Sequence, residues 1–184
     1  MNFTTTALPG VIAIEPEPAT DERGHFARQY SKREFFANDI TTEFVLTATS
    51  YNRRAGTLRG LHLQVAPFAE AKLVSCIRGR AFDVIVDLRP DSQSYGRWIS
   101  VELSPDDGTL VFIPEGCAHG FQTLAPDTTL HYQLSAEYHA EFARGVRWDD
   151  PTLAIDWPYA EPAVISARDR ALPWLGRAPI AKSA

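Results

Sequence analysis

Short runs in which hydrophobic and polar residues alternate make up most of the chain, and clusters of turn residues separate them. The clearest run covers residues 81–88, where alternate positions fall on opposite faces of an extended strand. One face then carries Phe82, Val84, Val86 and Leu88, and the other carries Asp83, Ile85 and Asp87. Further runs predict strands at residues 72–77, 98–103, 110–113 and 129–135. Strands that follow one another without intervening helices predict an all-β sandwich or barrel.

The predicted helices are few and short. Residues 31–38 begin with Ser31, a good N-cap, and Glu34 follows at the spacing of a capping box. A second short helix is expected at residues 166–171, inside a proline-rich tail that wraps irregularly from about residue 150 onward. The sequence shows no repeat, low-complexity segment or flexible linker, so residues 1–184 are interpreted as a single domain.

The composition allows a large core, because 45% of the 184 residues are hydrophobic and 11% are aromatic. A net charge of −5 argues against nucleic acid as a partner, since nucleic-acid binders normally carry a basic face. Cys76 and Cys117 are too few for a disulfide scaffold and lack the spacing of a zinc site, so we expect both to be reduced and buried. No segment has the pattern of a signal peptide or the apolar length of a membrane helix. These features predict a cytoplasmic protein that does not bind membranes.

One motif points to a more specific fold. Residues 108–119 follow the pattern G-x5-P-x-G-x2-H, which resembles the second signature of the cupin superfamily, β-jelly-rolls whose histidines usually bind a metal. The first signature, G-x5-H-x-H, is only half present: Gly56 and His62 match, but Gln64 stands where the second histidine belongs. A neutral amide is a poor replacement for imidazole on a transition metal, and Glu70 comes too late to be the acidic ligand. The motif therefore predicts a jelly roll without a metal.

Longer segments are similar to a single family. Residues 21–26, 56–64, 72–74, 79–90, 113–121 and 148–151 resemble, in this order, the dTDP-4-dehydrorhamnose 3,5-epimerase family, and the similarity extends from about residue 7 to about residue 173. The resemblance implies a cupin-type β-jelly-roll, or double-stranded β-helix, that works as a homodimer without a metal or other cofactor. It also implies an isomerase of deoxysugar biosynthesis, in the dTDP-rhamnose pathway. Such an enzyme epimerises a nucleotide-linked 4-keto-6-deoxyhexose, of the dTDP-4-dehydro-6-deoxyglucose type, at C3 and C5.

The chemistry of that substrate explains which residues matter. A 4-keto group acidifies the hydrogens on both flanking carbons, because the carbanion left behind delocalises onto O4 as an enolate. Inversion needs a base on one face of the ring, an acid on the other, and a cation or donor at O4. The resemblance implies His62 as the base, Tyr132 as the opposite-face acid and Lys72 as the group at O4. Asp169 matches the carboxylate that orients the base, and Asp83, on the polar face of its strand, is a second candidate for that role.

The substrate's diphosphate requires cations, and arginine can contact it through two parallel hydrogen bonds. The resemblance implies the following substrate-binding residues: Arg23, Arg59 and Arg168 for the phosphates, His119 near the pyranose, Tyr138 stacked on the nucleobase, and Phe26 packed nearby.

Five positions depart from the pattern of the thymidine-linked members of the family: Arg28, Thr47, Ala48, Thr49 and Ala143. Losing amide and carboxylate groups at these positions changes which groups of the base can be paired. The nucleotide is therefore left open between thymidine, cytidine, uridine and guanosine. The sequence also leaves open whether C3, C5 or both carbons are inverted, and which final sugar results.

Other functions stay open at this point. One is a metal-dependent cupin isomerase or dioxygenase, against which Gln64 argues, and another is a sugar-binding cupin without activity. A 3- or 5-mono-epimerase of a non-thymidine nucleotide sugar is the nearest variant of the leading hypothesis. Residues 11–14 form a strand-like segment that is a candidate for pairing across the subunits of the expected homodimer.

Overall fold

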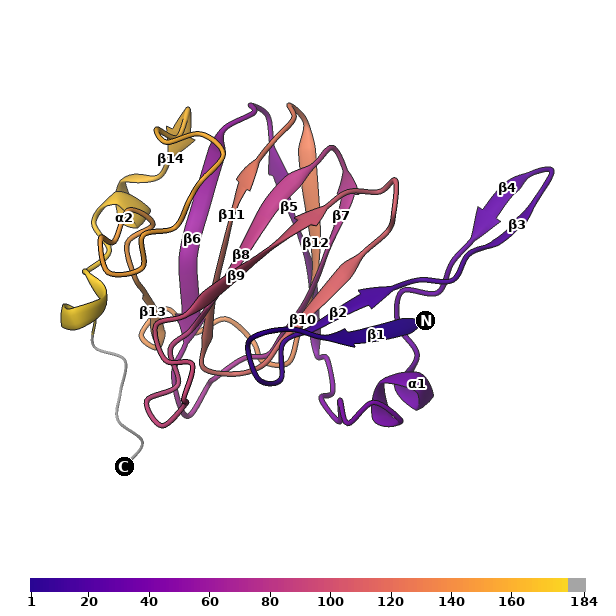
Figure 1. The fold of residues 1–184 in the computed structure, drawn as a ribbon, viewed down its shortest axis with the longest axis horizontal. Helices are drawn as coiled ribbons and strands as arrows, with labels where there is room; N and C mark the ends of the chain where they lie inside the picture. The colour runs from indigo at the N-terminus through magenta and orange to yellow at the C-terminus, as the bar shows by residue number, and fades with distance from the viewer. Residues whose placement is uncertain (179–184) are drawn as a thin grey trace.

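Two β-sheets face each other in the computed structural model, which describes residues 1–178 (Figure 1). Within these residues, the strands of the first sheet are, in spatial order, β1 (Asn2–Thr5), β2 (Ile12–Glu15), β10 (Leu110–Ile113), β7 (Lys72–Arg78), β12 (Thr128–Leu134) and β5 (Leu46–Asn52). Those of the second are β13 (Ala143–Gly145), β6 (Thr57–Gln64), β11 (Cys117–Thr123), β8 (Ala81–Asp87) and β9 (Trp98–Leu103), with β14 (Val164–Ile165) pairing in parallel with β6. The predicted all-β jelly roll is confirmed.

The five strands predicted from alternation are confirmed to within one residue at each end, as β7, β8, β9, β10 and β12. The strands that alternation did not predict include β5, β6 and β11. On β6 both faces are mostly buried, so its hydrophobic residues do not alternate with exposed polar ones. Polar side chains such as His62 and Gln64 interrupt its apolar pattern further.

Ser31 caps the first helix, α1 (Lys32–Phe36), as predicted, but the capping box is not completed, because the Glu34 carboxylate pairs with the Met1 ammonium and Arg28, each at 3.2 Å. The Ser31 hydroxyl accepts a hydrogen bond from the Glu34 amide at 3.5 Å. The helix ends earlier than predicted, because the Asn38 side chain donates to the Glu34 carbonyl at 2.8 Å and Asp39 has a positive φ of 61°.

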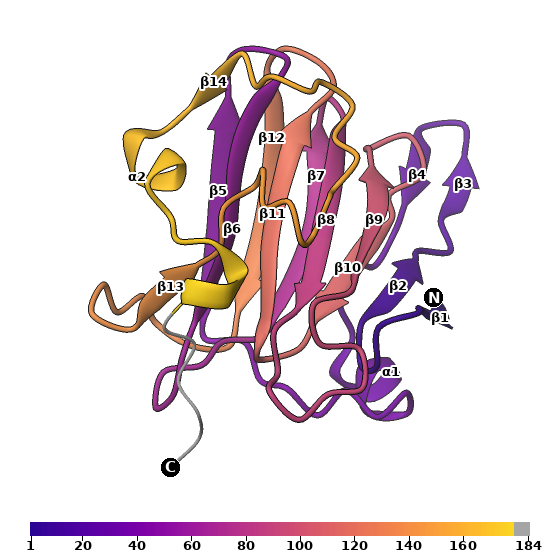
Figure 2. The ribbon, with the colours of Figure 1, turned by 60° about the vertical axis from the view of Figure 1, so that its left-hand side comes forward.

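The tail after residue 150 crosses the outer face of the second sheet and carries the short helix α2 (Ala167–Arg170) and the 3-10 turn η1 (Leu175–Arg177). Figure 2 shows this segment in yellow in front of β6 and β11. The predicted helix at 166–171 is confirmed in shortened form, capped by Ser166. Residues 179–184, the end of the predicted wrap, lie outside the described residues.

Three apolar clusters hold the sheets together. Val74, Ile85, Val111, Phe121 and Leu130 belong to the cluster between the two sheets. The tail covers the outer face of the second sheet in a second cluster, and α1 packs on the outer face of the first sheet in a third. Both faces of each sheet are therefore buried over much of their length.

The strand β8 shows the consequence of this layering for the sequence pattern. Its apolar face, with Val84 and Val86, packs outward under the tail, and Ile85 belongs to the cluster between the sheets. Asp83 shares that second face and is completely buried. The polar face predicted for β8 therefore turns into the protein rather than toward water.

The expected role of residues 11–14 in subunit pairing is wrong. Among the described residues, β2 is bordered by β1 on one side and by β10 on the other, so both of its edges are already occupied.

The two cysteines are buried and free, as predicted. Burial raises the pKa of the Cys117 thiol to about 12. Within residues 1–178, no helix is long and apolar enough to cross a membrane.

A close contact between β6 and β11 depends on Gly60. Its φ is +123°, and a Cβ at this position would lie 2.5 Å from the Gly120 Cα. Only glycine allows the two backbones to approach this closely, two residues before His62 on the same strand.

The loop after β8 is organised around one buried carboxylate. Asp87 accepts hydrogen bonds from the Arg89 guanidinium at 2.7 and 2.9 Å, from Ser92 at 2.6 Å and from Ser94 at 2.5 Å. Burial alone would raise the pKa of Asp87, but these hydrogen bonds outweigh it and hold the pKa well below its usual range. The native state therefore favours the ionised form.

We expect Asp87→Asn to lower the free energy of unfolding at pH 7 by about 3 kcal/mol, because it removes the buried partner of the ion pair and leaves the partly buried Arg89 uncompensated. Since the folded pKa lies below the unfolded value of about 3.9, this contribution is complete above that pH and is lost as the pH falls through the folded pKa. Urea unfolding at pH 7 and at pH 3 measures both effects. Asp91→Asn, an exposed change on the same loop, is the matched control. Equal losses at the two pH values would contradict the prediction.

Candidate active site

A cavity of about 550 Å³ lies between the two sheets, and both contribute ionisable side chains to it. Lys72 from β7 and Tyr132 from β12 belong to the first sheet. Arg59 and His62 from β6 and His119 from β11 belong to the second. The structure thus brings most of the predicted site residues together.

His62 is paired with a carboxylate from the distant tail. Its Nε2 lies 2.7 Å from Oδ1 of Asp169, and the two residues are 107 positions apart in the sequence. Asp169 is held in turn by the Gly60 amide, which donates to Oδ2 at 3.2 Å, and by the Ser166 cap of α2. A carboxylate partner requires Nε2 to carry the proton, which leaves Nδ1 of His62 as the basic atom.

The environment of Asp169 favours its charged form. Burial alone would raise its pKa, but the hydrogen bond and charge of His62, together with the Gly60 amide, outweigh burial and lower the pKa. His62 itself keeps 38% of its side chain exposed, so the imidazole is open to the cavity while its carboxylate partner is only 5% exposed.

Asp83 forms a second pair, with His119 and not with His62. Its Oδ2 lies 2.7 Å from His119 Nε2, so the alternative role of Asp83 as the partner of His62 is wrong. Burial raises the pKa of Asp83, and the charge and hydrogen bond of His119, which act in the opposite direction, do not outweigh it. Among the described residues, Oδ1 of Asp83 is buried without a hydrogen-bond partner.

Tyr132 reaches across the space between the sheets. Its ring meets that of His119 edge to face, with 5.9 Å between the ring centroids. Burial, and to a lesser extent the nearby Asp83, raises the pKa of Tyr132 well above that of a free phenol. Tyr132 therefore stays protonated and can donate a proton.

Lys72 begins β7, as predicted, and its ammonium forms an ion pair with Glu70. The two side chains are only 8% and 9% exposed. From the sequence, Glu70 was expected only to be too distant for a metal ligand, and this ion pair was not predicted. The spacing of Glu70 and Lys72 could have revealed this ion pair, because residues i and i+2 of an extended segment point the same way.

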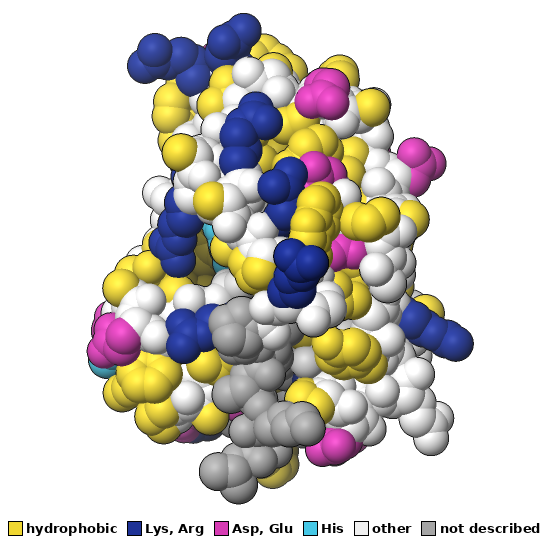
Figure 3. Space-filling view, turned by 90° about the vertical axis from the view of Figure 1, so that its left-hand side faces the viewer, with side chains coloured by type: hydrophobic (Ala, Val, Ile, Leu, Met, Phe, Trp, Pro, Cys, Tyr) yellow, Lys and Arg dark blue, Asp and Glu magenta, His cyan; other side chains and the backbone are white. Residues whose placement is uncertain are grey.

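Basic side chains gather around the mouth of the cavity (Figure 3). The Arg59 guanidinium is held by Asn52 Oδ1 at 2.8 Å and by the Tyr51 carbonyl at 3.3 Å. Arg168, on α2, also lines the cavity and donates to the Tyr138 hydroxyl at 3.1 Å. Tyr138 is exposed, so an aromatic ring linked to a guanidinium through its hydroxyl is open to solvent beside the cavity.

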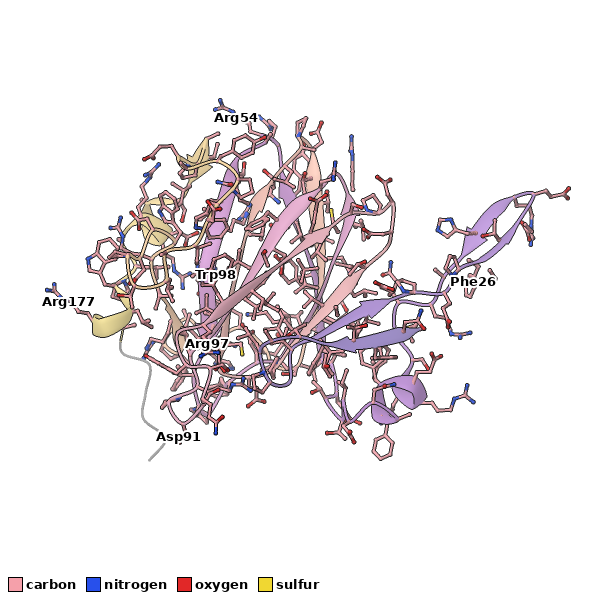
Figure 4. All side chains as sticks on the ribbon, viewed as in Figure 1. Phe26, Arg54, Asp91, Arg97, Trp98 and Arg177 are labelled. Atoms are coloured by element: carbon pink, nitrogen blue, oxygen red, sulfur yellow. The ribbon has the colours of Figure 1, made fainter. Side chains whose placement is uncertain are left out.

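Arg23 and Phe26 lie elsewhere. Both belong to the hairpin of β3 (Ala19–Asp21) and β4 (Gly24–Phe26), which extends away from the sheets (Figures 1 and 4). Phe26 is 71% exposed, and the Arg23 side chain is 84% exposed and paired with Asp21. Within the described residues, neither side chain lines the cavity of its own chain.

The positions that depart from the thymidine pattern are spread over the molecule. Ala48 and Thr49, on β5, line the cavity. Thr47 is on the same strand, and Ala143 begins β13. Arg28 follows the hairpin and lies 3.2 Å from Glu34.

The donor set does not fit a metal. Among residues 1–178, no group of three or more His, Cys, Asp or Glu side chains is arranged to hold a metal ion. Gln64 stands at the position of the missing histidine. Its side-chain amide forms hydrogen bonds with the backbone of neighbouring loops, at Phe68, Glu137 and His139.

A jelly roll with a histidine on one sheet, paired with a carboxylate from the tail and facing a protonated phenol and an ammonium on the other sheet, has the acid–base groups of an isomerase that moves protons. The family model for dTDP-4-dehydrorhamnose 3,5-epimerase matches residues 5–176. The enzyme of that name from Sinorhizobium fredii is 41% identical over 98% of this chain and 92% of its own length.

Two solved structures of similar enzymes point to the same family. A Bacillus anthracis dTDP-4-dehydrorhamnose 3,5-epimerase with TDP and PPi bound has a TM-score of 0.91 at 39% identity, covering 94% of this chain and 98% of that one. A Legionella pneumophila 3,5-epimerase in complex with dTDP-4-keto-L-rhamnose has a TM-score of 0.90 at 37% identity, covering 96% and 93%. The chain belongs to the dTDP-4-dehydrorhamnose 3,5-epimerase family, and it is an epimerase of the isomerase class.

The two aspartates paired with cavity histidines should titrate on opposite sides of the ordinary aspartate value of about 3.9. We expect Asp169 to titrate below it and Asp83 above it, because only Asp169 gains enough hydrogen bonds to outweigh burial. Carbon-13 NMR of the side-chain carboxyls measures both, and Asp83→Asn and Asp169→Asn assign the two signals. A pKa of Asp169 above that of Asp83 would contradict the prediction.

Proposed function

We propose that the enzyme inverts both C3 and C5 of dTDP-4-keto-6-deoxyglucose, with His62 as base and Tyr132 as acid. The observation that carries this proposal is the position of the two groups on facing sheets of one cavity. A sugar ring between the sheets would present one face to the imidazole and the other to the phenol. Loss of a proton to one side and its return from the other invert the carbon.

The first half of each inversion belongs to His62. Its Nδ1 takes the proton from C3 or C5, and the electron pair of the broken C–H bond moves into the enolate. The imidazolium that forms is stabilised by Asp169 at 2.7 Å, which is already ionised. A well-placed base of this kind contributes about 10² to 10⁴ in rate.

The charge that develops on O4 requires a donor inside the cavity. We assign this role to the Lys72 ammonium, with His119 beside the pyranose. A fixed positive charge in a site that excludes water stabilises an oxyanion more than water does.

Tyr132 completes the reaction by donating its proton to the opposite face of the enolate carbon. The new C–H bond forms as the phenol O–H bond breaks. The phenolate and the imidazolium then return to their starting protonation states by exchange with solvent, and the second carbon follows the same sequence.

Arg59 and Arg168 are proposed to bind the diphosphate, and Tyr138 to stack on the base. The exposed hairpin with Arg23 and Phe26 favours a homodimer in which the hairpin of one subunit reaches the cavity of the other.

We also propose that residues 1–184 form one domain and act in the cytoplasm, where reduced cysteines persist.

Deuterium exchange tests the proposed reaction. In D₂O the enzyme should incorporate deuterium at C3 and C5 of dTDP-4-keto-6-deoxyglucose, as read by NMR. His62→Ala should reduce exchange at both carbons by about 10³-fold, because the base is lost. Tyr132→Phe should slow inversion more than exchange, because the proton still leaves but does not return from the opposite face.

Calorimetric binding of dTDP to each variant controls for folding. The same assay with the UDP-, CDP- and GDP-linked sugars measures the preference for the base. Absence of exchange with all four nucleotides would overturn the proposed reaction, and exchange at a single carbon would reduce it to a mono-epimerase. Equal losses of exchange and inversion in Tyr132→Phe would remove that residue from the acid role.

Mixing two variants tests the hairpin. Arg23→Ala should raise KM, and His62→Ala should be inactive. After the two are unfolded and refolded together, mixed dimers should contain one site with an intact cavity and an intact hairpin from the other subunit, and wild-type KM should reappear in part of the activity. If only the raised KM is observed, the hairpin does not act across subunits.

A further inference from the structure

Gln64 and Glu70, the two residues that failed as metal ligands, are joined to each other. Gln64 is 2% exposed. Its Nε2 donates to the carbonyls of Phe68 at 3.1 Å and Glu137 at 3.0 Å, and lies 3.2 Å from Glu70 Oε2. Its Oε1 accepts from the His139 amide at 2.6 Å. Gln64 therefore anchors two loops and one carboxylate oxygen at the end of β6.

The other oxygen of Glu70 faces the cavity lysine. Oε1 accepts from the Lys72 ammonium, and Oε2 accepts from Gln64, so both oxygens of the carboxylate are used. An ammonium that is only 8% exposed requires a compensating charge, because removing an unpaired charge from water is costly. Glu70 supplies that charge from within the protein.

Backbone pairing alone does not fix the ammonium. The Lys72 backbone is set between Ile113 of β10 and Leu134 of β12. Four flexible methylenes separate this backbone from Nζ, and each rotatable bond moves the charge. Glu70 restrains the far end of the side chain, and Gln64 restrains Glu70.

We propose that Glu70, held by Gln64, is a positioning residue that aims the Lys72 ammonium at the substrate's O4. The proposal rests on the role assigned to Lys72 in the proposed function. Of the three N–H groups of the ammonium, one is committed to Glu70 and two are left for the enolate oxygen. Because the position of the ammonium is set before the substrate binds, the benefit falls on the reaction step rather than on binding.

A double-mutant cycle tests the proposal with dTDP-4-keto-6-deoxyglucose. Glu70→Gln keeps the size of the side chain and a hydrogen-bond acceptor but removes the charge. We expect kcat to fall about tenfold with KM within about twofold of the wild type. In a Lys72→Met background the same change should cost less than about twofold, because the residue it positions is gone.

Two further variants separate the positioning of Lys72 from the burial of an unpaired ammonium and from the general effect of removing an ion pair. Glu70→Asp keeps the charge, so no lone ammonium is buried, but withdraws the carboxylate by one methylene. Its kcat should lie between those of the wild type and Glu70→Gln. Glu102→Gln breaks the exposed Arg80–Glu102 ion pair on β9 and should leave kcat unchanged.

The outcomes separate this proposal from the one on which it rests. If Lys72→Met keeps wild-type kcat, the role of Lys72 in the proposed function fails, and the positioning role fails with it. If Lys72→Met is slow but Glu70→Gln costs the same in both backgrounds, or costs nothing in the wild type, only the positioning role is overturned. Wild-type kcat in Glu70→Asp overturns it as well.

Discussion

Charge compensation inside a narrow space is the constraint on which this active site depends. The cavity takes basic side chains partly or wholly out of water, and each must meet an acidic partner within the protein. Three such pairs are present among residues 1–178: His62 with Asp169, His119 with Asp83, and Lys72 with Glu70. In each pair the basic partner lines the cavity, and of the three carboxylates only that of Asp169 belongs to a lining residue. All three carboxylates are nearly buried, so they can orient the basic groups with little exposed negative charge to repel the anionic substrate of the proposed reaction.

The pairs share a chemistry but differ in their surroundings. Asp169 receives the Gly60 amide and sits at the capped start of α2, so its charge is well supported. Asp83 is enclosed by the sheet cluster, and one of its oxygens has no partner among the described residues. A carboxylate whose charged form is favoured stabilises the imidazolium that a catalytic base becomes during the reaction. This difference agrees with assigning the base role to His62 and a binding role to His119.

Local patterns predicted the local structure well. The Ser31 and Ser166 caps and the five alternating strands follow from short-range rules, and they are present. The strands β6 and β11 were not predicted, because burial on both faces removes the alternation of hydrophobic and polar residues that indicates a strand. The partner of Asp83 could not be deduced, because strand register across the sheet decides whether it meets His62 or His119. The position of the hairpin is likewise invisible in its sequence, since the projection of Phe26 depends on how β2 leaves the sheet.

The tail has a consequence for the order in which the molecule becomes complete. Every strand of the two sheets except β14 precedes residue 150, so the jelly roll can pair its main strands before the segment that carries α2 is synthesised. Asp169 arrives only with α2, close to the end of the described chain. A ribosome-bound chain can therefore hold His62 in its strand while the carboxylate that orients it is still missing. The proposed base therefore acquires its partner only after the main strands of both sheets have been made, so activity requires more of the chain than the jelly roll itself does.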